Sequence, residues 1–208
     1  MHKKCSWQDI IDSNAESIQL IWFGSILNKN THKWDMKSLY PVVIHEFKRI
    51  YNMEFLPESI PEQDFDMVLE YCRKYGIENH DDIRGIQKKN YTVLSTVFTW
   101  NKSDYLNAVL VEIPRSDFQH YAKREWEYDL YKTSYKLYDP NLWTQREIPD
   151  EKFAYVLVAP DDKIVNTWEP FMPYHENTRA GAYDYGTRFG QMFDETTYNV
   201  EWNLVYKE

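Results

Sequence analysis

The stretch Ile18–Leu27 (IQLIWFGSIL) is the most informative part of the sequence. Its first six residues are rich in β-branched and aromatic side chains, which predicts a buried strand. Gly24 and Ser25 end that strand abruptly. A glycine directly after a buried strand lets successive backbone N–H groups point outward and bind an anion or oxyanion. A simple turn glycine is the alternative interpretation, and spacing alone leaves both open.

Outward from this stretch, the pattern predicts further strands and a few helices. Phe118, Tyr121, Ala122 and Glu125 are spaced as one face of a helix. Regular alternation of strand and helix is rare in the middle of the chain, which favours an α+β fold over a doubly wound one. The expected strands are 41–50, 91–99, 104–113, 128–138 and 152–159, with 91–99 and 104–113 forming a hairpin. The expected helices are 65–75, 116–126 and 174–197.

Length and composition limit the classes of protein. The 208 residues suffice for one domain, and 17% of them are aromatic, which excludes a disordered tail. A net charge of −9 argues against a general nucleic-acid binder and against an anionic membrane surface. The N-terminus has no signal-peptide core, and no run approaches 18 apolar residues. We therefore expect a cytoplasmic protein with neither a nucleic-acid nor a membrane partner.

Glu125 is the strongest candidate for chemistry, because helical spacing places this carboxylate on an apolar face. A carboxylate in such a position is either paired or held for function. Periodicity leaves open whether Glu125 is a structural ion pair, a helix-edge residue that reaches solvent, or an acid/base. Glu127 lies on a different face of the same helix and is the natural control.

No metal site or nucleophile is predicted. His45-Glu46 begins like a zinc motif, but Arg49 stands where the second histidine should be. Cys5 and Cys72 form no CxxC pair, and no GxSxG motif surrounds Ser25. These observations predict no metal ligands and no covalent catalysis by Ser25.

Four segments in order resemble the γ-glutamylcyclotransferase-like family. Leu20–Leu27 (LIWFGSIL) resembles its YGSN or YGSL strand and loop, and Val43–Asn52 (VIHEFKRIYN) resembles its second strand. Residues 107–130 (NAVLVEIPRSDFQHYAKREWEYDL) are similar to its strand and helix that end in an acid. Residues 174–197 resemble its C-terminal helix, with Gly181, Ala182, Gly186, Phe193 and Thr197 as anchors.

The resemblance implies a small mixed β-barrel with packed helices, in a single domain over residues 1–208. It further implies a cofactor-independent enzyme, described as a lyase or acyltransferase, that cyclises a small γ-glutamyl compound to 5-oxoproline. Glu125 matches the catalytic glutamate, and Phe23, Gly24, Ser25 and Ile26 match the loop that binds the glutamyl group. Phe23 and Ile26 depart from the family motif, and residues 56–90 look like a helical insertion.

Two other functions stay open. The first is a non-catalytic binding or regulatory module that uses the same barrel pocket, because a fold does not fix a function. The second is a glycan binder that uses the eight tryptophans and 17 tyrosines. Release of 5-oxoproline separates the enzyme from both alternatives.

Overall fold

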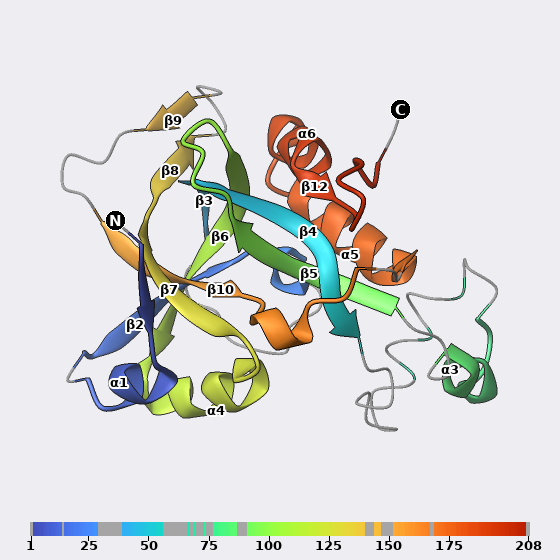
Figure 1. Ribbon diagram of the computed structural model, residues 1–208, viewed down its shortest axis with the longest axis horizontal. Helices are drawn as coiled ribbons and strands as arrows, with labels where there is room; N and C mark the ends of the chain where they lie inside the picture. Colours follow the sequence, from blue (N-terminus) through green and yellow to red (C-terminus); the bar gives the residue numbers. More distant parts are fainter. Residues whose placement is uncertain are drawn as a thin grey trace.

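The protein is described by a computed structural model. The described residues are 2–13, 15–28, 39–55, 77–86, 91–139, 144–146, 152–166 and 169–206, with residues 66, 69 and 73. Of the helix expected at 65–75, the described residues include only 66, 69 and 73. Within the expected insertion at 56–90, α3 (His80–Ile86) is described, and Figure 1 shows it to one side of the strands.

Eight strands form one curled sheet (Figure 1). Its β2 and β10 are parallel, and its other neighbours are antiparallel. In spatial order the strands are β1 (Lys3–Cys5), β7 (Asp129–Ser134), β10 (Phe153–Val158), β2 (Ser17–Trp22), β6 (Tyr105–Pro114), β3 (Leu39–His45), β8 (Lys136–Asp139) and β9 (Thr144–Arg146).

A second sheet, of four strands, packs against the curled sheet. Its order is β11 (Glu169–Pro170), β5 (Tyr91–Phe98), β4 (Phe47–Phe55) and β12 (Thr197–Tyr198). The buried hydroxyl of Thr96 in β5 donates to the carbonyl of Leu157 in β10 at 2.6 Å, which joins the two sheets. This arrangement of mixed sheets with separate helices confirms the expected α+β class.

The pairing of the central strands differs from the sequence prediction. The strand expected at 41–50 is two strands, because Glu46 adopts a φ of 67° and turns the chain between β3 and β4. The hairpin expected from 91–99 and 104–113 is wrong, although both strands exist: β5 pairs with β4, whereas β6 pairs with β2 and β3. The chain therefore changes sheets between residues 99 and 104.

Helices cover the open sides of the sheets. The helices α1 (Trp7–Ile11) and α4 (Arg115–Glu125) lie side by side, and α4 begins one residue before its expected start at 116. The helix expected at 174–197 is two helices, α5 (Met172–Tyr183) and α6 (Thr187–Glu195). α5 ends at Tyr183 with Asp184 as its C-cap, and Gly186 is the N-cap of α6, with a φ of 113° that favours glycine. Gly186 thus serves the turn between the two helices, and a Cβ there would meet nothing within 4 Å.

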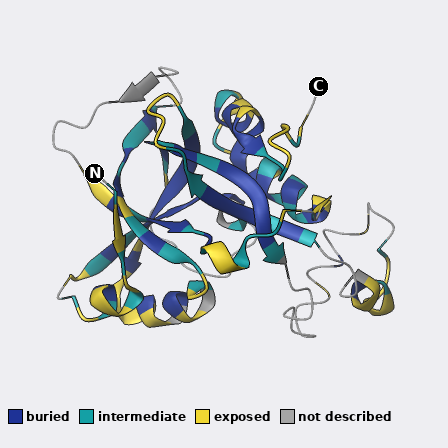
Figure 2. Cartoon of the chain, in the orientation of Figure 1, coloured by how far each residue is buried: buried dark blue, intermediate teal, exposed yellow. Residues whose placement is uncertain are grey.

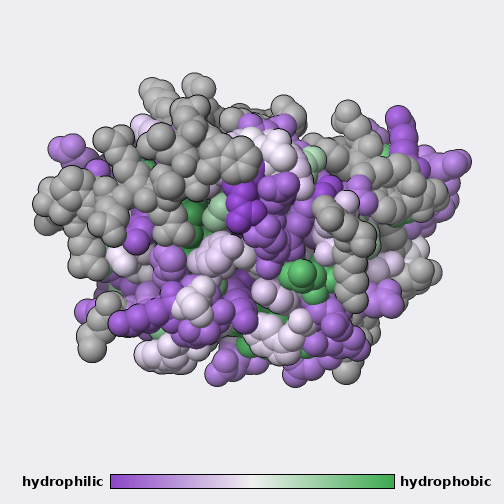
Figure 3. Space-filling model, turned by 90° about the horizontal axis from the view of Figure 1, so that it is seen from above, coloured by the Kyte–Doolittle hydropathy of each residue, from purple (hydrophilic) through white to green (hydrophobic). Residues whose placement is uncertain are grey.

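The core follows the strands and the inner faces of the helices, while the outer faces of α1 and α4 are exposed (Figure 2). Among the described residues on the face seen in Figure 3, most are hydrophilic and the hydrophobic ones form isolated spots. Within the described ranges, no helix combines the length and the apolar character that a bilayer crossing requires.

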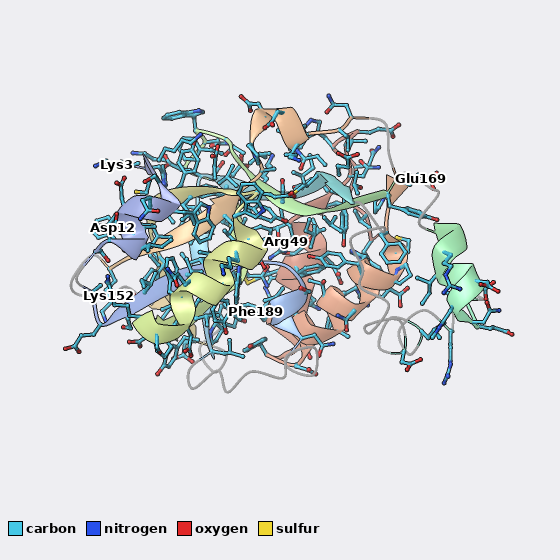
Figure 4. The ribbon with its side chains drawn as sticks, turned by 90° about the horizontal axis from the view of Figure 1, so that it is seen from below. Lys3, Asp12, Arg49, Lys152, Glu169 and Phe189 are labelled. Carbon is cyan, nitrogen blue, oxygen red and sulfur yellow. The ribbon has the colours of Figure 1, made fainter. Side chains whose placement is uncertain are left out.

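Arg49 is fully buried in the middle of the molecule (Figure 4). Its guanidinium donates to the Phe23 carbonyl at 3.1 Å and to the carbonyl and side chain of Asn107. It also donates to the hydroxyls of Thr196 and Thr197 at 3.4 and 3.2 Å. Burial lowers the pKa of Arg49 to about 9, which leaves it charged at neutral pH. One side chain therefore holds β4, β6, the end of β2 and the C-terminal segment together.

We predict that Arg49→Met lowers the free energy of unfolding by about 3 kcal/mol, because buried oxygens lose their donors. Arg188→Met is the matched control. Arg188 forms a partly exposed ion pair with Glu195 at 2.6 Å, and such pairs contribute about 1 kcal/mol or less. Urea unfolding of both variants measures the difference, and equal losses would contradict the central role of Arg49.

His175 of α5 is a second buried ionisable group, with 1% of its surface exposed. Its Nδ1 lies 3.1 Å from the hydroxyl of Tyr51, and its Nε2 has no hydrogen-bond partner among the described residues. Burial lowers the pKa of His175 to about 4. The imidazole is therefore neutral in the folded protein at neutral pH.

This depressed pKa predicts a pH-dependent stability. Between pH 4 and 6.5 the unfolded chain binds a proton that folded His175 does not, so this group makes stability rise with pH. We expect the stability advantage of the parent over His175→Gln to shrink by about 3 kcal/mol from pH 7 to pH 4. Urea unfolding at several pH values checks this, and a constant difference would contradict it.

Candidate functional site

The turn after β2 forms one wall of the candidate site. β2 ends at Trp22, and a short 3-10 helix, η1 (Ser25–Leu27), follows Gly24. On one side the Phe23 carbonyl accepts from buried Arg49. On the other side α5 packs directly against the turn, since a Cβ on Gly181 would lie 2.2 Å from the backbone nitrogen of Asn28. Both contacts fix the position of the turn.

Tyr174 of α5 reaches into this turn. Its hydroxyl oxygen accepts the Ser25 backbone N–H at 3.2 Å. A Cβ on Gly24 would lie only 2.4 Å from the same oxygen, so glycine is what permits this approach. The backbone donor that we predicted for an anion is thus already bonded to a neutral hydroxyl, which a ligand can replace.

Glu125 enters the site from a different element. It is the last residue of α4, whose Phe118, Tyr121 and Ala122 are buried as the helical period predicts. Glu125 itself is half-buried, because it sits where that packed face meets the helix end. Its carbonyl accepts the N–H of Tyr128 at 2.9 Å, which turns the chain toward β7.

A single cavity brings the turn and Glu125 together. It is small, about 40 Å³, and partly open. Its walls comprise the turn after β2, the end of α4 and apolar side chains from the two sheets. The lining residues are Trp22, Phe23, Gly24, Ser25, Leu94, Glu125, Tyr128, Leu157 and Tyr174.

The lining has a simple chemical character. Glu125 is its one carboxylate among the residues that the structure describes, and no described lysine, arginine or histidine lines it. The other polar groups of the described lining include the tyrosine hydroxyls, the Trp22 indole N–H, Ser25 and backbone amides. Such a site can exchange a proton at Glu125 and donate backbone hydrogen bonds in a partly dry environment.

Of the predicted residues, Phe23, Gly24, Ser25 and Glu125 line this cavity, whereas the side chain of Ile26 lies outside the described part. Their roles stay predictions. Tyr128 and Tyr174 also line the cavity, and sequence reasoning did not select them. Tyr174 begins the C-terminal family-like segment, which is the one signal that pointed toward it.

The close approach at Gly24 can be tested by a double-mutant cycle. Gly24→Ala should lower the free energy of unfolding by about 1 kcal/mol, because its Cβ displaces the Tyr174 hydroxyl. Tyr174→Phe removes that hydroxyl, so the double variant should be more stable than the sum predicts by at least about 0.5 kcal/mol. Urea unfolding gives the coupling, and strict additivity would contradict the contact.

Comparison with known proteins supports the fold. No model of a protein family matches the chain, and no curated protein matches its sequence. A solved γ-glutamyl cyclotransferase superposes with a TM-score of 0.53 at 10% identity, covering 86% of each chain. An uncharacterized human protein superposes with a TM-score of 0.54 at 11% identity, covering 93% of each chain. The chain therefore has the γ-glutamylcyclotransferase-like fold that its four sequence segments predict.

Proposed function

We propose that this protein cleaves a γ-glutamyl amide or peptide by intramolecular cyclisation, releasing 5-oxoproline and an amine. The observation that carries the proposal is the shared cavity, in which the half-buried carboxylate of Glu125 and the Gly24 turn line the same space. The fold agrees with this chemistry, and one of the solved structures that share the fold is a γ-glutamyl cyclotransferase.

The reaction would proceed at the γ-carbonyl of the substrate. The substrate's own α-amine forms a new C–N bond to that carbonyl and closes a five-membered ring, and the original amide C–N bond breaks. Glu125 takes the proton that the attacking amine loses and gives it to the leaving amine. Atoms and charge balance with one carboxyl group, and acid/base catalysis of this kind contributes about 10²- to 10⁴-fold.

Binding supplies the rest of the acceleration. A well-oriented intramolecular attack is worth roughly 7–11 kcal/mol, so the protein mainly has to hold the glutamyl group folded. Backbone N–H groups of the Gly24 turn would bind the substrate carboxylate or the developing oxyanion, with the Ser25 N–H released from Tyr174. Trp22, Leu94 and Leu157 give this space apolar walls that limit competing water.

The non-catalytic binding module is the second candidate, because the Ser25 N–H that would stabilise an oxyanion is already bonded to the Tyr174 hydroxyl. Either function requires the cavity of about 40 Å³ to widen for a ligand, since small-molecule sites are usually larger. A module of this kind would bind a γ-glutamyl ligand and return it unchanged.

Glu125→Gln distinguishes the two functions. In a panel of γ-glutamyl amides and peptides, we expect the parent to release 5-oxoproline and Glu125→Gln to lose about 10²- to 10⁴-fold in kcat, because the proton carrier is gone. KM should change little, since glutamine keeps the shape of the side chain.

Glu127→Gln is the matched control, because Glu127 lies two residues away and does not line this cavity. It should retain parental turnover. Saturable binding of a γ-glutamyl compound without 5-oxoproline release by the parent would favour the binding module. Parental turnover by Glu125→Gln would overturn the assignment of Glu125.

A further inference from the structure

A second, larger cavity lies beside the candidate site. It runs between the N-terminal segment of β1 and α1 and the turn from α4 into β7, and its volume is about 390 Å³. That volume is within the range of small-molecule sites. Tyr128 lines both cavities, but Glu125 and the Gly24 turn line only the first. Nothing in the proposed cyclisation uses the second cavity.

Two indole rings form part of its lining. Trp126 is 69% exposed, which is unusual for so large an apolar side chain, and it lines the cavity together with Trp7. The indole N–H of Trp7 donates to the Tyr128 carbonyl at 2.8 Å. Trp7 has therefore already used its one donor, and what it can still offer a ligand is the surface of its ring.

The charges of the lining are uneven. Glu127 and Asp129 bring two carboxylates, and Lys4 brings one ammonium group. Lys4 already donates to Asp129 at 2.6 Å, so it is engaged and offers little to an anionic ligand. Glu127 meets Lys163, which is outside the lining, at a loose 4.0 Å, and the Glu127 side chain is 44% exposed. Its charge is only weakly compensated, as in partly exposed pairs generally.

We propose that this second cavity binds a small organic cation, an ammonium group that carries an apolar stem. The ammonium group lies against the indole of Trp126, where the negative face of the ring attracts it. The carboxylate of Glu127 favours the same sign of charge, whereas Asp129 is already paired with Lys4. The apolar stem takes the remaining space beside Trp7 and Leu130. The site is independent of Glu125 and of 5-oxoproline chemistry.

Choline and 3,3-dimethyl-1-butanol are suitable probes, because they have nearly the same shape and differ in charge. Isothermal titration of the full chain should give saturable choline binding at least about tenfold tighter than binding of the uncharged alcohol. Trp126→Ala should weaken choline binding about fivefold or more, since cation–π contacts of this strength are typical of partly exposed sites. Glu127→Gln should also weaken choline binding relative to the parent, and it should make that binding less sensitive to salt.

Trp100→Ala is the matched control, because Trp100 is 82% exposed and belongs to the connection between β5 and β6. It should bind choline as the parent does. Equal affinity for choline and the alcohol, tighter binding of an anion such as acetate, or no saturable choline binding would each overturn the proposal. Unchanged affinity in both Trp126→Ala and Glu127→Gln would do the same. Because the readout is binding, failure here leaves the cyclisation proposal untouched.

Discussion

The buried guanidinium of Arg49 is the contact on which the rest of this structure depends. It meets the end of β2 at Phe23, β6 at Asn107 and the C-terminal segment at Thr196 and Thr197. Arg49 and these partners come from the four sequence segments that resemble the γ-glutamylcyclotransferase-like family. The hydrogen-bond acceptors described for Arg49 are neutral oxygens, and its guanidinium also stacks 4.3 Å from the ring centre of Phe193. A buried charge is costly unless such acceptors are held in place, so it constrains how the segments pack.

That constraint extends directly to the candidate site. The carbonyl that Arg49 binds belongs to Phe23, the residue before Gly24, and the turn is held on its other side by α5. Glu125 arrives independently, at the end of a helix whose apolar face packs on the sheet. Two separate elements therefore present a backbone turn and a carboxylate to one cavity, as the proposed cyclisation requires.

The end of α4 serves two cavities of different character. Toward the Gly24 turn, the described lining combines apolar walls, two tyrosines, Ser25 and the carboxylate of Glu125, as the proposed proton transfer requires. Toward β1 the lining is aromatic and richer in charge, with Trp126 exposed. Tyr128 lines both cavities. Its hydroxyl donates to the Leu94 carbonyl at 3.3 Å, and its backbone carbonyl accepts the indole N–H of Trp7. Glu125 and Trp126, which are adjacent in sequence, therefore line different cavities.

Local sequence determined the elements that local patterns control. The apolar run at Ile18–Phe23 predicted β2, helical spacing predicted α4 with Glu125 on its inner face, and the glycine after β2 predicted a turn. These predictions succeeded because side-chain period and backbone freedom are properties of a few consecutive residues. The resemblance of four ordered segments also predicted the fold.

The tertiary structure decided what depends on distant residues. Pairing of β5 with β4 instead of β6 follows from hydrogen bonds across the sheets, and the split at Glu46 requires a positive φ that no propensity indicates. Only packing brings the Tyr174 hydroxyl to Ser25, 149 positions away in sequence, and only packing places the N-terminal segment against Trp126. The sequence by itself selected Glu125 and the Gly24 turn, and the packing of α4 and β2 around one sheet decided that they share a cavity.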